Sequence, residues 1–282
     1  MSWREAHSAA MVAATYAHED LGVARDGYVD VFAAINAGGM LALGRPLGQF
    51  FGLYLGDETG DPGIMVNSDF DETVVRHTAA HELGHARLGH GTTADTRIEA
   101  LENWGVRRWP EPEKAAEAFA AWFLMPRGAV HWALGAMGRS AVSTAADAYQ
   151  LSLWLGTSFR GTVRHLANIR MITPRQAEEW GAAGAGASRR ALDGASAPPS
   201  GRHWVLGQDA DACALHVRAG DRFTLRGIEA DGDAALPDGV NATGRHILEV
   251  GTALREPAQL ALGKDWKIDL IPASDRRGMI LT

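Results

Sequence analysis

The sequence contains very little cysteine, with Cys213 as the single thiol in 282 residues. One cysteine excludes an intramolecular disulfide framework and agrees with a reducing cytoplasm. The first twenty residues lack a basic start followed by an apolar core, so we expect no signal peptide. No run reaches the ~18 uninterrupted apolar residues that a membrane span requires. We therefore expect a cytoplasmic protein with no membrane partner.

Positive charge is also scarce for a chain that would bind nucleic acid as its main function. The 27 Lys and Arg residues are outnumbered by 34 Asp and Glu residues, which gives a formal net charge of −7. This balance disfavours extended contact with phosphate backbones, although it permits local basic patches. Hydrophobic residues make up 46% of the chain, which is enough for an ordinary folded core.

The strongest motif is His81-Glu82-Leu83-Gly84-His85, an HExxH pentapeptide. On a helix, residues four apart lie on one face with Cβ atoms roughly 5–6 Å apart, so His81 and His85 can bind one metal ion. Glu82 is offset by one residue and lies beside the metal, where it can accept a proton from a zinc-bound water. Gly84 leaves room for the close approach of a neighbouring element.

A catalytic zinc site commonly has three protein ligands and a water, so a third ligand is needed. The continuation HExxHxxGxxH is absent, because Leu88 and Gly91 occupy its glycine and third histidine positions. Better candidates lie in residues 111–126, where a proline near each end is typical of a helix. Glu113 and Glu117 share one side of that helix, and spacing alone does not choose between them.

Three stretches together resemble the ImmA/IrrE metallopeptidases. They are Gly63–Asn67 (GIMVN), Arg76–His85 (RHTAAHELGH) and the pattern Glu113…Ala116…Phe119-Ala120…Leu124-Met125-Pro126. In that family the glutamate thirteen residues before the final proline is the third zinc ligand, and the resemblance implies this role for Glu113. The sequence departs from the pattern at Glu117, where Asn is usual, and at His77, where Phe is usual. The resemblance covers about the first 180 residues.

The resemblance implies a zinc metalloendopeptidase with one Zn²⁺ per chain, held by His81, His85 and Glu113, and with Glu82 as catalytic base. Manganese would tolerate the same donors. The implied substrate is a helix-turn-helix repressor, cleaved in a DNA-damage, phage-defence or mobile-element response, with single-stranded DNA or a small molecule as activator. The competing interpretation is a non-proteolytic, zinc-stabilised regulator or an antitoxin-like partner-binding protein. The intact HExxH favours the enzyme, because a purely structural zinc site would have no use for Glu82, which is not a metal ligand.

We expect an α+β fold. Its parts are a zincin-like metallopeptidase domain (1–135), a helical, helix-turn-helix-like segment (136–180), a flexible linker (181–202) and a small all-β C-terminal module (203–282), which is a candidate sensor domain. The linker prediction depends on the Gly, Ala, Ser and Pro content of its residues. The module is predicted from short apolar runs separated by turn residues, the last of them at 279–281.

Within the first domain, helices are predicted over 3–18 and 28–36, and strands over 40–43, 50–55 and 63–67. In zincin-like folds the strand nearest the metal has a free edge on which an extended substrate can lie. Met65-Val66-Asn67 is our candidate for that edge, which predicts Val66 and Asn67 as substrate-binding residues.

The helix-turn-helix interpretation depends on two helical runs, 145–155 and 158–168, joined by a glycine-containing turn. The second run is basic, which is typical of DNA or partner contact; its basic residues are Arg160, Arg164 and His165, and Arg170 follows it. The alternative is a packing element with a solvated basic face. The acidity of the whole chain favours this alternative.

Four further side chains have two interpretations each. His90 either ends the HExxH helix or contacts substrate, and Glu117 is either a second carboxylate at the metal or a neighbour of it. For His77 we favour packing over acid–base chemistry. Cys213 could block the metal as a thiolate ligand, but its position beyond the linker favours a buried, inert thiol.

Overall fold

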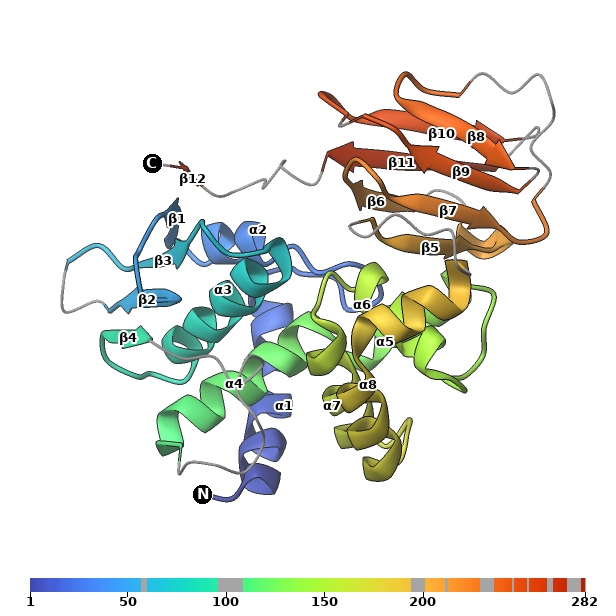
Figure 1. Ribbon diagram of the computed structural model, residues 1–282. Coiled ribbons are helices and arrows are strands. Elements are labelled where there is room, and N and C mark those ends of the chain that lie inside the picture. The colour runs from blue at the N-terminus through green and yellow to red at the C-terminus, as the bar shows by residue number, and fades with distance from the viewer. Residues whose placement is uncertain are drawn as a thin grey trace. The chain divides into compact units, whose positions relative to one another are not determined.

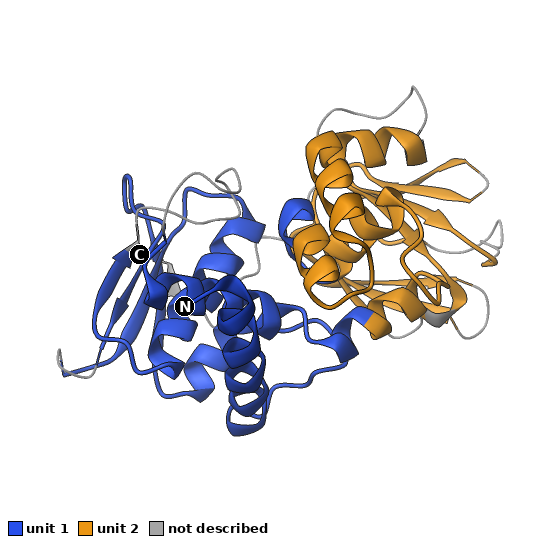
Figure 2. Ribbon diagram, turned by 90° about the horizontal axis from the view of Figure 1, so that it is seen from below, with its two compact units in different colours: residues 1–130, 155–161, 276–282 blue, residues 131–154, 162–275 orange. Residues whose placement is uncertain are grey.

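A computed structural model describes ten segments of the chain (Figure 1), namely residues 1–56, 60–95, 109–193, 201–210, 213–228, 236–244, 246–252, 254–262, 266–272 and 280–281. The chain divides into two compact units (Figure 2). The first comprises residues 1–130, 155–161 and 276–282, and the second comprises residues 131–154 and 162–275. No helix in the described part of the chain is long and apolar enough to cross a membrane.

The first unit combines helices with one mixed sheet. It contains α1 (Trp3–Asp20), α2 (Val31–Ala37), β1 (Leu41–Arg45), β2 (Gly52–Leu55), β3 (Gly63–Asn67), α3 (Glu72–Arg87), β4 (Thr93–Asp95), α4 (Glu111–Leu124), the start of α5 (Arg127–Ala136) and β12 (Ile280–Leu281). The predicted helices and strands agree with these elements to within a few residues, and β4 is an addition to them. The strand order is β12-β1-β3-β2-β4, in which β1 pairs in parallel with β3 and β2 is antiparallel to both of its neighbours.

Helices α3, α4 and α1 lie in successive layers against the β2–β3 part of this sheet. Helix α1 packs along α4 through a stripe of alanines that are at most 1% exposed: Ala6, Ala10, Ala14 and Ala17. The spacing of three to four residues places them on one face, and their small side chains allow the two helices to lie close together. The capping box at Ser2 and Glu5 fixes the start of α1.

Arg76 of α3 forms hydrogen bonds with two loops of the first unit, one at Val29 and one at Gly156. Arg76 is 3% exposed, and its guanidinium donates hydrogen bonds to Val29 O (2.8 Å) and Gly156 O (3.1 Å) and stacks on the Tyr28 ring at 4.0 Å. The Gly156 turn is the one predicted to join the helices of a helix-turn-helix. In the structure this turn is anchored to α3, so it is part of the first unit.

The second unit combines the remaining helices with two small sheets. It contains the rest of α5, α6 (Ala145–Trp154), most of α7 (Phe159–Asn168), α8 (Pro174–Asp193), β5 (His203–Leu206), a short 3₁₀ helix (Gln208–Ala210), β6 (Ala214–Val217), β7 (Arg222–Leu225), β8 (Val240–Gly244), β9 (Ile247–Val250), β10 (Ala258–Leu262) and β11 (Trp266–Pro272). The sheet orders are β10-β11-β6 and β5-β7-β9-β8.

Helix α6 packs against β5 rather than standing in a separate segment. The Gln150 side chain accepts a hydrogen bond from Val205 N at 2.8 Å and donates one to His203 O. The rings of Trp154 and Trp204 meet edge to face, with centroids 5.6 Å apart. His165 of α7 is 1% exposed, so it does not contribute to a solvated basic face. DNA contact by the exposed Arg160 stays a prediction.

Two parts of the predicted organisation are wrong. Residues 181–193 are not a flexible linker, because α8 extends to Asp193 with a kink at Gly184, where φ is +75°; residues 194–200 lie outside the described part. Alanine, which is frequent there, is the best helix former. The last strand also differs, because β12 pairs in parallel with β1 of the first unit and is not part of an all-β module.

Candidate metal centre

The HExxH residues lie on the buried face of α3. Asp71 begins the helix by accepting a hydrogen bond from Thr73 N. His81 and His85 are at most 1% exposed, and their ring centroids lie 4.9 Å apart. Their Nε2 atoms are 3.1 Å apart, so both rings direct the same nitrogen to one point. This is the arrangement expected from the four-residue spacing on a helix.

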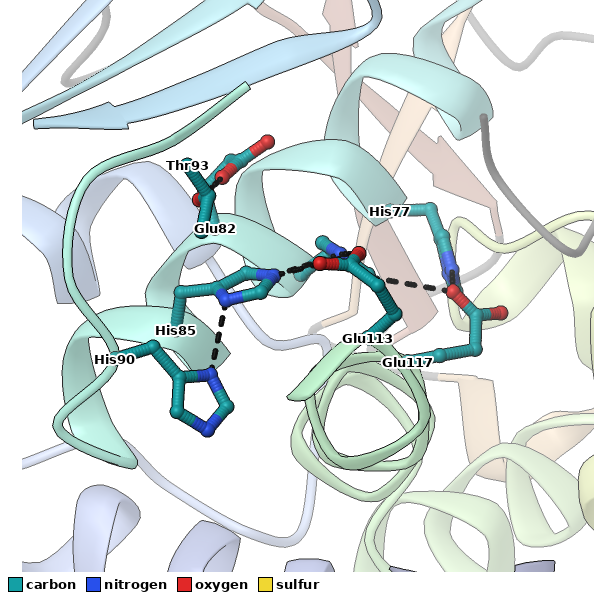
Figure 3. A network of polar contacts seen from close by, with 8 residues as sticks. His77, Glu82, His85, His90, Thr93, Glu113 and Glu117 are labelled. Atoms are coloured by element: carbon teal, nitrogen blue, oxygen red, sulfur yellow. Dashed lines mark hydrogen bonds and ion pairs between the residues drawn. The ribbon is translucent and has the colours of Figure 1, made fainter. Parts of the chain in front are cut away.

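Helix α4 brings Glu113 to the same point because it crosses α3 closely at Gly84. A Cβ at Gly84 would lie 3.0 Å from a ring carbon of Phe119 and 3.1 Å from the Cα of Ala116. Only glycine permits this approach, as the sequence predicts. Glu113 lies one turn before Ala116 on α4, and its carboxylate points toward His85 (Figure 3).

The three side chains form a group with the geometry of a metal centre. The Glu113 Oε2 atom lies 3.3 Å from His81 Nε2 and 3.6 Å from His85 Nε2. Ligand atoms that are each ~2.0–2.1 Å from a tetrahedral zinc ion lie about 3.4 Å from one another. The observed separations of 3.1, 3.3 and 3.6 Å therefore fit one such ion.

Glu113 is negatively charged, which favours binding of a cation. Burial works against ionisation of its carboxyl group, but the hydrogen bonds and charge interactions with His81 and His85 hold its pKa well below the usual range. A group with a lowered pKa is a carboxylate at neutral pH. Glu113 therefore offers a negative oxygen opposite two imidazole nitrogens.

Glu82 lies beside this group and has different neighbours. It is fully buried, and its Oε2 accepts a hydrogen bond from Thr93 Oγ1 of β4 at 3.4 Å. Figure 3 shows Glu82 and Thr93 together, away from the Glu113 carboxylate. A Cβ at Gly52 of β2 would lie only 2.5 Å from Glu82 Oε1. Gly52 and Thr93 are absent from the predicted site, because a glycine and a threonine in short strands carry no sequence signal.

Glu117 lies next to the three-residue group but outside it. Its Oε2 is 2.9 Å from His77 Nε2 and 3.4 Å from His81 Nδ1, the ring nitrogen that does not face Glu113. Burial works against its ionisation, but the charge of His77, the hydrogen bond from His77 and the nearby His81 ring keep the Glu117 pKa well below the usual range. His77 is therefore bonded to a carboxylate and is not a simple packing residue.

His90 contacts the second histidine of the motif. Its Nδ1 lies 2.9 Å from the Nδ1 of His85, and the two rings meet nearly edge to face with centroids 4.9 Å apart. His90 follows the end of α3, so it is held against the outer nitrogen of His85. Burial and the neighbouring His85 lower the pKa of His90.

The predicted substrate-binding edge is wrong. Strand β3 lies between β1 and β2 in the sheet, so it has no free edge. Val66 and Asn67 are each 1% exposed, and the Asn67 amide donates hydrogen bonds to the backbone oxygens of Gly48 and Phe50. Asn67 therefore holds the loop before β2. Cys213 lies in the second unit and is buried.

Comparison with known proteins identifies the part of the chain that carries this group. Residues 39–154 match the family model of the M78 peptidases, described as the IrrE N-terminal-like domain. The matched stretch includes α3 and α4 and therefore all three side chains of the candidate metal centre. No curated protein matches the chain.

Proposed function

Because the chain carries a peptidase domain of the ImmA/IrrE family, we propose that it is a zinc-dependent endopeptidase. The observation that carries this proposal is the convergence of His81 Nε2, His85 Nε2 and Glu113 Oε2 within 3.6 Å of one another. Two imidazoles and one carboxylate are a frequent ligand set of catalytic zinc in proteases. Such a set would leave the ion accessible to water or substrate.

In the proposed reaction, zinc when bound supplies Lewis acidity, which polarises the peptide carbonyl and makes water a better nucleophile. His81, His85 and Glu113 would hold the ion. Glu82 holds and moves the proton: its carboxylate accepts a proton as the water oxygen bonds to the carbonyl carbon. It then donates this proton to the amide nitrogen as the carbon–nitrogen bond breaks. The burial of Glu82 excludes bulk water from this transfer.

The substrate polypeptide is proposed to lie along β4. This strand ends the sheet order of the described residues, and its Thr93 contacts Glu82. An extended peptide can add to an exposed strand edge through backbone hydrogen bonds. This arrangement would bring a peptide carbonyl close to the proposed base, which β3 cannot do from its central position.

We further propose that the substrate is a helix-turn-helix repressor. This part of the proposal comes from the resemblance in the motifs Arg76–His85 and Glu113–Pro126. A DNA-binding substrate would be met in the cytoplasm, which agrees with the near absence of cysteine. Single-stranded DNA is the activator to test first.

The direct test is to incubate the purified full chain with a helix-turn-helix repressor, chosen from the genes that neighbour its own. Four conditions are compared: with and without zinc, and with and without single-stranded DNA. We expect one discrete cut in the repressor that requires zinc and disappears when a chelator is added. An uncut repressor under all four conditions would contradict the substrate, and cleavage that persists after complete removal of metal would contradict the mechanism.

Gly52→Ala is expected to damage the site without removing a metal ligand. The added methyl group would collide with Glu82 Oε1 and with Thr78 Cγ2, which lies 2.4 Å from the Cβ position. Overpacking of this kind costs about 1–3 kcal/mol of stability. A catalytic group displaced by ~1 Å can cost ~100-fold in rate. We expect unchanged zinc content and a turnover lowered about 100-fold, measured with metal analysis and repressor cleavage.

Gly27→Ala is the matched control, because a Cβ at Gly27 would meet nothing within 4 Å. Both variants exchange a loop or strand glycine for alanine. Equal turnover in the two variants would show that Gly52 does not determine the position of Glu82.

A further inference from the structure

We propose that Glu117 is a positioning residue for His81: its carboxylate holds the outer nitrogen of the ring, so that Nε2 is directed to the metal. This inference rests on the proposed function, since it assigns a supporting role at the same site. The proposed contact is at Nδ1 of His81, the ring nitrogen that faces away from Glu113. Such outer contacts fix the tautomer and the orientation of a metal-binding histidine.

The contacts on the His81 ring are divided between its two nitrogens. Nε2 lies 3.3 Å from Glu113 Oε2 and 3.1 Å from His85 Nε2. Nδ1 lies 3.4 Å from Glu117 Oε2. A histidine that ligates through Nε2 must carry its proton on Nδ1, and a carboxylate is a strong acceptor for that proton. Glu117 is thus on the correct side to stabilise the binding tautomer.

Glu117 is itself held in place by His77. Its Oε2 is 2.9 Å from His77 Nε2, and His77 lies one helical turn before His81 on α3. The carboxylate of α4 therefore contacts two successive turns of α3, and Figure 3 shows it beside His77. Glu117 is only 7% exposed, so water competes little for its oxygens. His77 and Glu117 are also the two positions at which the sequence departs from the family pattern, and here they contact each other.

The two metal-binding histidines have different outer partners. The Nδ1 of His85 lies 2.9 Å from an imidazole nitrogen, the Nδ1 of His90, whereas the Nδ1 of His81 lies 3.4 Å from a carboxylate oxygen of Glu117. The charged acceptor raises the basicity of the His81 ring more than an imidazole would. We therefore expect Glu117 to contribute to zinc affinity through His81.

The same contacts argue against Glu117 as an alternative third ligand. Its Oε2 lies at Nδ1 of His81, on the opposite side of the ring from the Nε2 that faces Glu113 and His85. One ion cannot contact Nε2 of His81 and a carboxylate held at Nδ1 of the same ring. The two glutamates of α4 consequently have separate roles.

The test compares Glu117→Ala and Glu117→Gln in the full-length protein. Zinc affinity is measured by competition with a chromophoric chelator, which does not require substrate. Loss of an outer partner typically costs about 10- to 100-fold in metal affinity, which we expect for Glu117→Ala. Glu117→Gln keeps a neutral acceptor oxygen of similar position, so a smaller loss is expected. Because the Gln variant preserves size, it keeps the test valid if the Ala variant does not fold.

Glu111→Ala is the matched control, since it removes the same charge from an exposed position on the same helix. A second readout is the ¹⁵N and ¹H resonance of the histidine Nδ1–H groups in the zinc-loaded protein. Exchange of a carboxylate acceptor for an amide should move one such proton resonance upfield in Glu117→Gln. The Glu111→Ala spectrum should match that of the wild type.

The outcomes separate the two proposals. Wild-type protein that binds no zinc would overturn the proposed function together with this inference. Wild-type protein that binds zinc, with unchanged affinity and an unchanged resonance in both Glu117 variants, would overturn the positioning role alone. A graded loss of affinity from wild type through Gln to Ala, with the resonance shift, supports it.

Discussion

Glu82→Gln is expected to keep its zinc and to lose nearly all peptidase turnover. Glu82 is fully buried beside the candidate metal centre and lies outside the three-residue ligand group. The amide has almost the same shape as the carboxylate but cannot accept a proton from water. General base catalysis contributes about 10²- to 10⁴-fold, so turnover should fall by that factor. Metal analysis and repressor cleavage by the same preparation provide the measurement.

Glu72→Gln is a suitable control for this variant. Glu72 lies in the first turn of the same helix, two and a half turns before the HExxH residues, so it should leave turnover unchanged. Undiminished cleavage by zinc-loaded Glu82→Gln would remove the assigned base. Loss of zinc from that variant would instead mean that Glu82 belongs to the ligand set.

His81→Ala is expected to lose tight zinc binding. The ring supplies one of three converging ligand atoms, and its Nε2 lies within 3.3 Å of both others. The loss should exceed the ~10- to 100-fold effect typical of an outer partner, because a direct ligand is removed. Zinc stabilises the folded state by mass action, so the wild-type melting temperature should rise with added zinc. The melting temperature of His81→Ala should not respond at the same zinc concentrations.

His131→Ala is the control for His81→Ala, because His131 is an exposed histidine outside the first unit. It should show the wild-type response to zinc. If His81→Ala still binds zinc as tightly as His131→Ala does, the proposed ligand set is wrong. Together with the Glu117 variants, this series separates a direct ligand from an outer partner and from a histidine that does not bind the metal.

The helix geometry of the site could be predicted because it depends on local spacing. His81 and His85 are four residues apart, and residues with this spacing lie on one face of a helix. Gly84 also carried information, since a residue without a side chain predicts close approach, and α4 does pass there. Spacing left Glu113 and Glu117 undecided because both lie on the same side of α4. Only the packing of α4 on α3 separates them.

The mistaken predictions concern contacts between distant parts of the chain. The sequence pattern of β3 suits an edge strand, but its hydrogen bonds to both β1 and β2 place it in the centre of the sheet. An apolar strand has the same sequence pattern in either position. The pairing of β12 with β1 joins residues more than two hundred positions apart, which no local pattern encodes. Residues 181–193 form a helix and not a linker because the helix propensity of their alanines outweighs the flexibility of their glycines.

The sequence by itself determined the chemistry of the candidate centre: two imidazoles on one helical face, an adjacent carboxylate, and a second helix rich in small residues and glutamates. Helical periodicity is a property of the backbone, so these relations follow from residue numbers alone. The tertiary structure decided which glutamate faces the rings, which strand borders Glu82, and which side chains hold the outer nitrogens of His81 and His85. These outcomes depend on where one helix or strand crosses another, and that is set by packing between residues far apart in the chain.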